Sequence, residues 1–344
     1  MKHEDWRETT LQERNRRLFA EELDGFVPGR VFDAHVHVLN PGVMPAGETY
    51  DCAGHALASY TLDDLAADLP AIYPGRETSA LCFGFPIPHY DFQRNNQYLG
   101  DHCDRRRWFA LRLADPAEPD REAVRRDLAS GRFAGIKPYP DYVRHKPLAE
   151  VEVDDMLPAW LMEMVNDLGL IVTLHLPRPG RLADPLNRAQ VVRLCRRYPR
   201  AKIILAHIGR AYYWRAVAGN LDELRELPNL WFDLAMLNHR EVIEYLFRTV
   251  PVEKVLYGTD LPLALAPGKS VEINHQYSYV TPVPWHLAIC DTTHRVRFTS
   301  FLYEELRAIR DAATGARLSA AAVESIFHGN AIQLLECLTR RHEE

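Results

Sequence analysis

Two histidines, His35 and His37, stand two residues apart in the apolar, β-branched run 31–38. Side chains at positions i and i+2 of a strand point to the same face, so both imidazoles can reach one metal ion while their neighbours pack on the other face. The spacing therefore predicts a strand that ends in a metal site. The alternative is that the two histidines alternate on a strand for packing or surface reasons.

Three further ionisable residues end apolar runs downstream, namely His175, His207 and Asp260. Taken alone, such a histidine is more often a packing or loop residue, and such an aspartate often caps a turn. If the runs are parallel strands of one sheet, however, these side chains point into one small volume together with His35 and His37. Three histidines and a carboxylate are a suitable ligand set for zinc or a similar divalent ion.

The elements that must position these residues are short β-rich runs that alternate with helical patterns. We expect strands at 31–38, 79–85, 108–113, 133–138, 170–176, 202–208, 230–235 and 254–260. Helical patterns lie at 61–69, 119–130, 155–168, 185–198, 219–226, 239–248, 297–313, 319–327 and 330–341. This alternation predicts an α/β fold, a (β/α)₈ TIM barrel, whose strand ends carry the chemistry. A doubly wound open sheet is the alternative, but no Gly-x-Gly-x-x-Gly motif follows a strand.

The domain organisation that we predict is one barrel, residues 30–344, preceded by a helical extension, residues 1–29. Residues 4–24 carry apolar positions near helical spacing among many charges, which is typical of an amphipathic helix. Two long connections, 39–60 and 261–296, follow the first and the eighth strand and are expected to form lids and substrate walls at the barrel mouth.

Composition narrows the classes of partner and the compartment. The 344 residues carry a net charge of −6, and the basic residues form no long run, so we expect a small-molecule substrate and no nucleic acid. Neither a signal peptide nor a membrane span is visible, which predicts a soluble cytoplasmic protein with no membrane partner. The six cysteines include no C-x-x-C pair and are expected to be reduced.

Several short motifs recur along the chain in a specific order. They are Asp33-x-His35-x-His37, Gly135-Ile136-Lys137-Pro138-x-Pro140, Thr173-x-His175, Ala206-His207-Ile208-Gly209, Tyr257-Gly258-Thr259-Asp260 and Gly329-Asn330-Ala331. Together they resemble the amidohydrolase superfamily, in particular its amidohydrolase-2 branch, over roughly residues 30 to 335. That branch includes metal-dependent hydrolases, lactonases and decarboxylases similar to aminocarboxymuconate-semialdehyde decarboxylase.

The resemblance implies that His35, His37, His175 and Asp260 bind one divalent metal ion, most simply zinc, although manganese and iron share such ligands. It also implies that His207 is the general acid or base and that Asp260 takes part in catalysis. A bound metal lowers the pKa of water toward about 7. In binuclear members a lysine at the place of Lys137 is carboxylated and bridges two metals. The alternative for Lys137 is a salt bridge near the barrel mouth.

Arg210 and Arg178 present planar forks that suit a substrate carboxylate, with a surface ion pair as the alternative for each. Asp33 and Asp233 are expected to support the site, and Asn330 to cap the final helix.

We therefore predict a metal-dependent hydrolase acting on a small carbonyl compound, such as a lactone, ester or amide bearing a carboxylate. A non-oxidative decarboxylase using the same metal is the first alternative. A barrel that binds a ligand without turnover is the second alternative. By analogy with the branch, a homodimer is possible.

Overall fold

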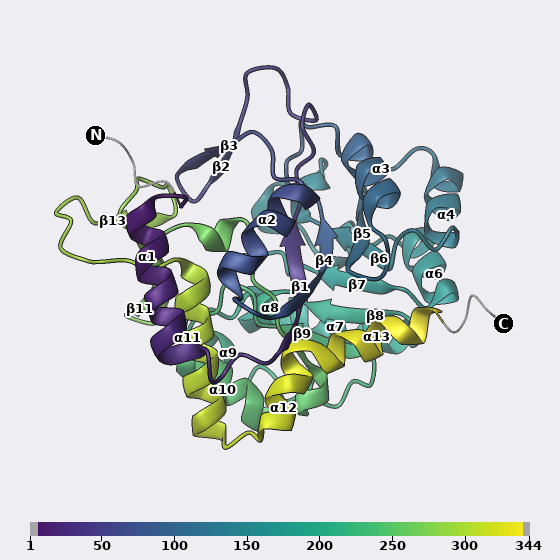
Figure 1. Cartoon of the computed structure of the whole chain (residues 1–344). Helices are drawn as coiled ribbons and strands as arrows, with labels where there is room; N and C mark the ends of the chain where they lie inside the picture. Colours follow the sequence, from purple (N-terminus) through teal and green to yellow (C-terminus); the bar gives the residue numbers. More distant parts are fainter. Residues whose placement is uncertain (1–5, 340–344) are drawn as a thin grey trace.

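The computed structural model describes residues 6–339, with side chains to residue 336. Eight parallel strands follow one another around a barrel with helices outside it (Figure 1). Their order is β1 (Arg30–His37), β4 (Glu77–Phe83), β5 (Trp108–Ala114), β6 (Gly135–Pro138), β7 (Ile171–Leu174), β8 (Lys202–Leu205), β9 (Leu230–Asp233) and β10 (Val255–Leu256). The prediction of a (β/α)₈ barrel is confirmed.

The barrel closes between its first and last strands through the residues that follow β10. The backbone N–H of Asp260 donates to the carbonyl of His35 (2.8 Å), and that of His37 donates to the carbonyl of Leu261 (2.7 Å). Asp260 itself has a φ of +71°, in the left-handed region that few residues other than glycine adopt. The ladder therefore ends earlier than the expected strand 254–260, and Asp260 lies on a turn at the barrel mouth.

The described α-helices are α1 (Thr9–Leu18), α2 (Leu62–Ile72), α3 (Phe92–His102), α4 (Arg121–Ala129), α5 (Val153–Met156), α6 (Ala159–Leu168), α7 (Pro185–Arg197), α8 (His207–Arg210), α9 (Trp214–Val217), α10 (Arg240–Thr249), α11 (Phe301–Ala316), α12 (Ala320–Glu324) and α13 (Asn330–Thr339). The expected helix at 219–226 is wrong, because this segment forms turns. Gly219, the first residue of this segment, has a φ of +74°, which lies outside the helical region.

The N-terminal segment packs along α11. Helix α1 continues into a π-helical turn, Phe19–Leu23, and Leu11, Phe19 and Leu23 are buried. Asn15 is also buried, and its side chain exchanges two hydrogen bonds with Ser300, at the start of α11 (2.9 and 3.0 Å). Residues 4 and 5 of the expected helix, like residues 340 and 341 of the expected final one, lie outside the described residues.

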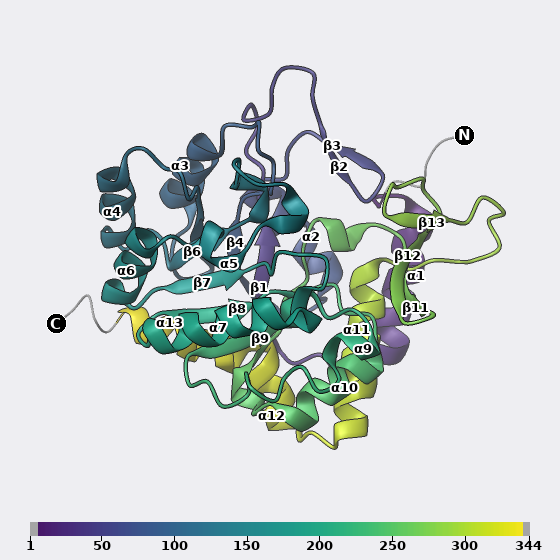
Figure 2. The ribbon, with the colours of Figure 1, turned by 180° about the vertical axis from the view of Figure 1, so that it is seen from behind.

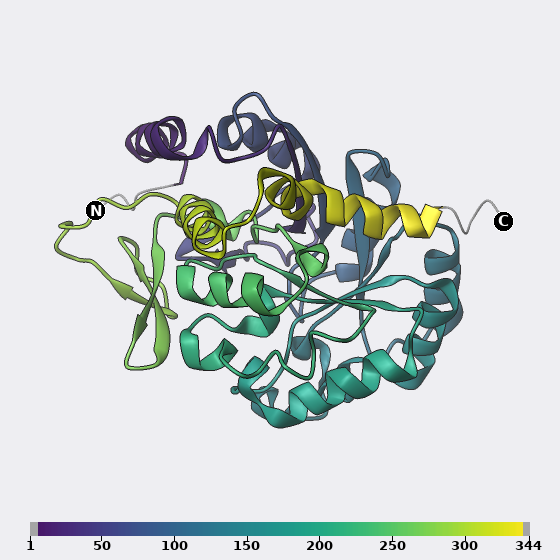
Figure 3. The same cartoon turned by 90° about the horizontal axis from the view of Figure 1, so that it is seen from below.

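Both long connections at the mouth contain strands. The first holds the hairpin β2 (Tyr50–Cys52) and β3 (His55–Leu57). The second holds a three-stranded sheet, β11 (Lys269–Ile273), β12 (Gln276–Thr281) and β13 (Ala288–Cys290). This sheet stands out from the barrel on the side of α1 (Figure 2), as the view from below also shows (Figure 3). Across residues 6–339, every helix is too short or too polar to cross a lipid bilayer.

Candidate active site

The turn after β10 brings Asp260 against the two histidines of β1. Its Oδ1 lies 2.9 Å from His37 Nε2 and 3.6 Å from His35 Nε2. The three donor atoms lie within 4.8 Å of one another, a spacing at which they can bind one metal ion. Because β1 is a strand, the i and i+2 positions share this face, as the sequence predicts.

The fold holds the Nδ1 atoms of three histidines, His35, His37 and His207. Nδ1 of His37 donates to the carbonyl of Gly84 (3.1 Å), and Nδ1 of His207 donates to that of Ala235 (2.9 Å). A carbonyl only accepts, so both rings carry their proton on Nδ1 and leave the lone pair of Nε2 free. Nδ1 of His35 contacts the carboxylate of Asp233 (2.9 Å). Such outer contacts orient imidazoles for metal binding.

Burial keeps His35, His175 and His207 neutral. It lowers the pKa of His35 and His175 well below the usual range, and it lowers the pKa of His207 to about 4. Burial opposes ionisation of Asp260, but its contacts with His37 and His35 outweigh it and hold the pKa of Asp260 below its usual value. Neutral imidazoles beside an ionised carboxylate are the protonation states that metal ligation requires.

Two buried nitrogen atoms at the barrel centre have no hydrogen-bond partner among the described residues, Nδ1 of His175 and Nζ of Lys137. The His175 ring centroid lies 5.5 Å from that of His207. Lys137 lies over the ring of Phe83 at 4.4 Å, and burial lowers its pKa to about 8. An unpaired buried polar atom costs about 1–3 kcal/mol, so His175 fits a role as a further metal ligand.

A cavity of about 280 Å³ opens above this group, and the four histidines and Asp260 all line it. The fold therefore gathers His35, His37, His175, His207 and Asp260 in one place. Lys137 lies fully buried and is not in the cavity wall. Aromatic side chains form much of the wall: Tyr50, Phe85, Tyr139, Tyr212, Tyr277, Tyr279 and Trp285.

The two arginines expected at the substrate separate. Arg210 lines the cavity, whereas Arg178 does not, because its Nε is paired with Asp184 Oδ2 at 2.8 Å. The prediction for Arg178 is therefore corrected, and the structure places Arg181 in the wall in its stead. No spacing in the sequence distinguishes Arg181 from Arg178. Asp141 also lines the cavity, and its place directly after the Gly135–Pro140 motif was the signal that could have found it.

Asp33 and Asp233 support the site from below, as expected. Asp33 accepts hydrogen bonds from the backbone N–H groups of His35 and Thr259 (3.0 Å each), and burial raises the pKa of Asp33 to about 7. Asn330 does not cap the final helix. Its side-chain amide donates instead to the carbonyls of Val252 and Val255 (2.8 Å each), which ties the start of α13 to β10.

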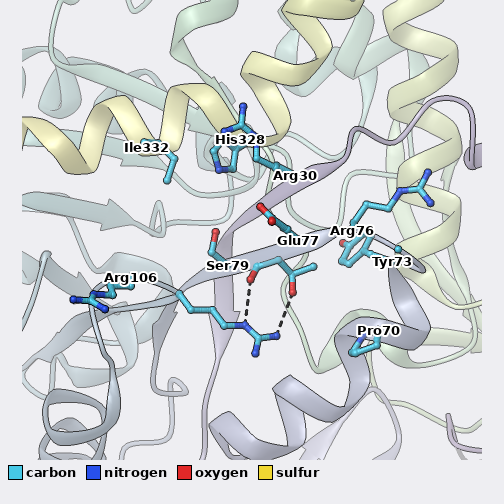
Figure 4. Close-up of a pocket in the computed structure, with 12 residues that line it drawn as sticks. Arg30, Pro70, Tyr73, Arg76, Glu77, Ser79, Arg106, His328 and Ile332 are labelled. Atoms are coloured by element: carbon cyan, nitrogen blue, oxygen red, sulfur yellow. Dashed lines mark hydrogen bonds between the residues drawn. The ribbon is translucent and has the colours of Figure 1, made fainter.

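A second, larger cavity of about 570 Å³ lies at the opposite end of the barrel, where β1 and β4 begin (Figure 4). Three of the four arginines in its wall have partners: Arg30 pairs with Glu324 (2.9 Å), Arg76 with Asp24 (2.6 Å), and Arg107 donates to the carbonyl of Thr78 (3.2 Å). Barrel enzymes work at the other end, so the active-site candidate is the histidine cavity.

The comparisons with known proteins identify the family of the chain. The family model described as Amidohydrolase matches residues 32–336. The chain therefore belongs to the amidohydrolase family, of the amidohydrolase-2 type, as the motifs predict. No curated protein sequence matches it.

Solved structures show the same fold. A 2,6-dihydroxybenzoate decarboxylase from Rhizobium is 14% identical, with a TM-score of 0.53, and the match covers 90% of this chain and 99% of that one. A 4-oxalomesaconate hydratase from Rhodopseudomonas palustris is 17% identical, with a TM-score of 0.52 and 91% and 98% coverage. A 5-carboxyvanillate decarboxylase from Novosphingobium aromaticivorans, complexed with manganese, is 14% identical, with a TM-score of 0.53 and 91% and 97% coverage.

Proposed function

We propose that the protein is a metal-dependent hydrolase that opens a lactone, ester or amide bond of a small carbonyl compound. The observation that carries this proposal is the orientation of His207. Its Nδ1 proton is held by the carbonyl of Ala235, so Nε2 is an acceptor beside the histidine and aspartate ligands. A neutral imidazole in this orientation is a base, which is what the activation of water requires.

His35, His37, His175 and Asp260 would hold the metal ion, with zinc as the first choice and manganese or iron as alternatives. Such an ion, when bound, polarises a carbonyl oxygen and lowers the pKa of water. A second ion bridged by a carboxylated Lys137 is the weaker proposal, because Lys137 Nζ is packed over aromatic rings and no carboxylate is paired with it in the described chain.

The chain's own residues then complete the reaction. Nε2 of His207 accepts a proton as the oxygen of water bonds to the carbonyl carbon. The same imidazole returns the proton to the leaving oxygen or nitrogen as its bond to carbon breaks. Asp233 accepts the backbone N–H of His207 (2.7 Å) and so keeps the base in place. The aromatic wall limits the entry of bulk water.

A non-oxidative decarboxylase is the second candidate, and the aromatic wall favours it. Seven aromatic side chains line the cavity, and flat rings pack well against such surfaces. Two of the compared structures are decarboxylases named for aromatic acids, 2,6-dihydroxybenzoate and 5-carboxyvanillate. In this alternative His207 would protonate the ring carbon that loses CO₂.

The test is product analysis in ¹⁸O-labelled water. The metal-loaded protein would be incubated with carboxylated lactones, esters and amides, and separately with hydroxylated benzoic acids. A hydrolase places one ¹⁸O in the product acid, whereas a decarboxylase releases CO₂ and leaves the other product unlabelled. We expect the first result. If the benzoic acids release CO₂ and none of the lactones, esters or amides is hydrolysed, the protein is a decarboxylase instead.

His207→Gln tests the role of the base. The variant should lose about 10²- to 10⁴-fold in kcat and retain its metal, because Gln cannot cycle a proton. Steady-state kinetics and metal analysis on the same preparation check both parts. Full activity in His207→Gln would contradict the assignment of His207 as the base.

A further inference from the structure

Two arginine side chains in the cavity wall, Arg181 and Arg210, form no ion pair within the described chain. Arg181 belongs to the short 3-10 helix after β7, Arg181–Ala183, and Arg210 ends α8. Nη1 of Arg210 donates to the carbonyl of Leu176 (2.9 Å), while its Nε is buried without a partner. Neither guanidinium forms an ion pair with a described carboxylate.

The two cations also act on each other. Burial, and after it the charge of Arg181, lowers the pKa of Arg210, although a guanidinium stays charged at neutral pH. The cavity wall offers two carboxylates, Asp141 and Asp260. Asp260 contacts His37, and Asp141 forms no ion pair with either arginine, although burial raises the pKa of Asp141 and the charge of Arg210 acts against that rise. Two adjacent unpaired cations in a partly enclosed cavity are costly, and an anionic ligand would remove that cost.

Aromatic stacking fixes Arg181 without consuming its hydrogen-bond donors. Its guanidinium lies 4.7 Å from the ring centroid of Tyr277, on β12, and 5.5 Å from that of Tyr212. Stacking on ring faces leaves the N–H groups at the edge of the guanidinium plane free. Those groups form a fork that matches a carboxylate.

We propose that Arg181 and Arg210 bind an acid group of the substrate that is not the reacting group. The inference rests on the proposed function, since it assumes that the bond broken lies at the histidine and aspartate group of the same cavity. It specifies the substrate class as a carboxylated lactone, ester or amide whose carboxylate survives the reaction. If the reaction is instead a decarboxylation, the same pair requires a substrate with a second acid group.

The test is binding of matched probes to the metal-containing protein by isothermal titration calorimetry. The probes are isophthalate, with two carboxylates, and benzoate, with one. We expect isophthalate to bind wild type more tightly than benzoate. Arg181→Gln and Arg210→Gln should each weaken isophthalate roughly ten- to a hundredfold and abolish its advantage over benzoate. The metal content of these variants should stay at the wild-type level.

Arg197→Gln is the matched control, because Arg197 also stacks on a tyrosine, Tyr198 at 5.3 Å, but does not line the cavity. Its isophthalate affinity should equal that of wild type. Should Arg210→Gln fail to fold, Arg181→Gln and Arg181→Lys carry the test, with Lys expected to retain part of the binding. Wild-type isophthalate affinity in the folded cavity variants would overturn the proposal, as would an equal loss in Arg197→Gln or no binding to wild type.

Failure of this inference can be told apart from failure of the proposed function. Arginine-dependent isophthalate binding without hydrolysis of any carbonyl compound would leave the acid site intact and reject the hydrolase. The opposite outcome is hydrolysis of neutral and carboxylated substrates with equal kcat/KM, together with isophthalate binding that is unchanged in both arginine variants. It would support the hydrolase and reject the acid site.

Discussion

At the scale of single residues, Asp233 connects His35, a proposed metal ligand, to His207, the proposed base. Its Oδ2 accepts Nδ1 of His35 (2.9 Å) and its Oδ1 accepts the backbone N–H of His207 (2.7 Å). One buried carboxylate at the end of β9 therefore orients an imidazole on β1 and fixes the turn that presents another after β8. Such contacts decide where a ligand nitrogen points.

Asp233→Ala should accordingly lower metal affinity about 10- to 100-fold, because His35 loses the partner that holds its ring. Chelator competition measures this directly. Asp115→Ala is the control: Asp115 is also a buried aspartate after a barrel strand, but it pairs with Arg144 (2.9 Å) and does not line the cavity. Equal metal affinity in the two variants would show that Asp233 has no orienting role.

Residue patterns predicted the histidine and aspartate group better than they predicted the arginines of the cavity wall. The pair His35 and His37 is found by spacing alone, since a strand has a period of two. Arg181 is not found this way, because its position depends on a left-handed φ of +52° and on stacking against Tyr277 in a distant insertion. Arg178, three residues earlier, was predicted to contact the substrate, but it forms an ion pair with Asp184 instead.

At the scale of elements, helix α11 places a carboxyl group among the buried acids of the barrel. Glu305 is fully buried; its Oε2 accepts the backbone N–H of Met236 (3.0 Å) and its Oε1 has no partner. Burial, and after it the charge of Asp33, raises the pKa of Glu305 well above its usual value. The neighbouring Glu304 pairs with Lys269 (2.7 Å), and although burial opposes ionisation, this contact lowers the pKa of Glu304.

The two residues predict opposite pH effects on the free energy of unfolding. For Glu305 the native state keeps a proton that the unfolded state releases above about pH 4.3, so its contribution to stability falls as pH rises. Glu305→Gln should remove this loss. In the chelator-treated protein, the gain in free energy of unfolding over wild type should be about 1–3 kcal/mol larger at pH 8 than at pH 5. Glu304→Gln should destabilise it at pH 8. Urea unfolding at both pH values checks the pair, and a wild-type pH slope in Glu305→Gln would contradict the account.

Hydrophobic periodicity predicted the eight strands but missed α3. The buried face of that helix carries Asn95 and Asn96, which bind backbone groups of neighbouring strands: Asn95 donates to the carbonyl of Val38, and Asn96 contacts both backbone groups of Leu113. Hydrogen bonds from these asparagines join the apolar contact of Leu99 in burying the helix, so its buried face is partly polar in sequence. The small sheet β11–β13 was likewise expected only as a long loop.

At the scale of the whole molecule, the barrel gathers at one end residues that are far apart in sequence. His35 and His37 come from β1, while His175, His207 and Asp260 follow β7, β8 and β10. The alternation of strands and helices was enough to predict this convergence, because parallel barrel strands all end at the same mouth. The wall over it comes from insertions whose side chains the sequence could not place. Assembly into a homodimer stays a prediction, which light scattering would check.

The most direct test of the central claim is the metal content of protein purified without added metal, measured by mass spectrometry on wild type and His37→Ala side by side. We predict about one divalent ion per chain in wild type and close to none in His37→Ala. His102→Ala, which removes an exposed imidazole on α3, should keep the wild-type content. No ion in wild type, or equal content in wild type and His37→Ala, would contradict a metal centre at these residues.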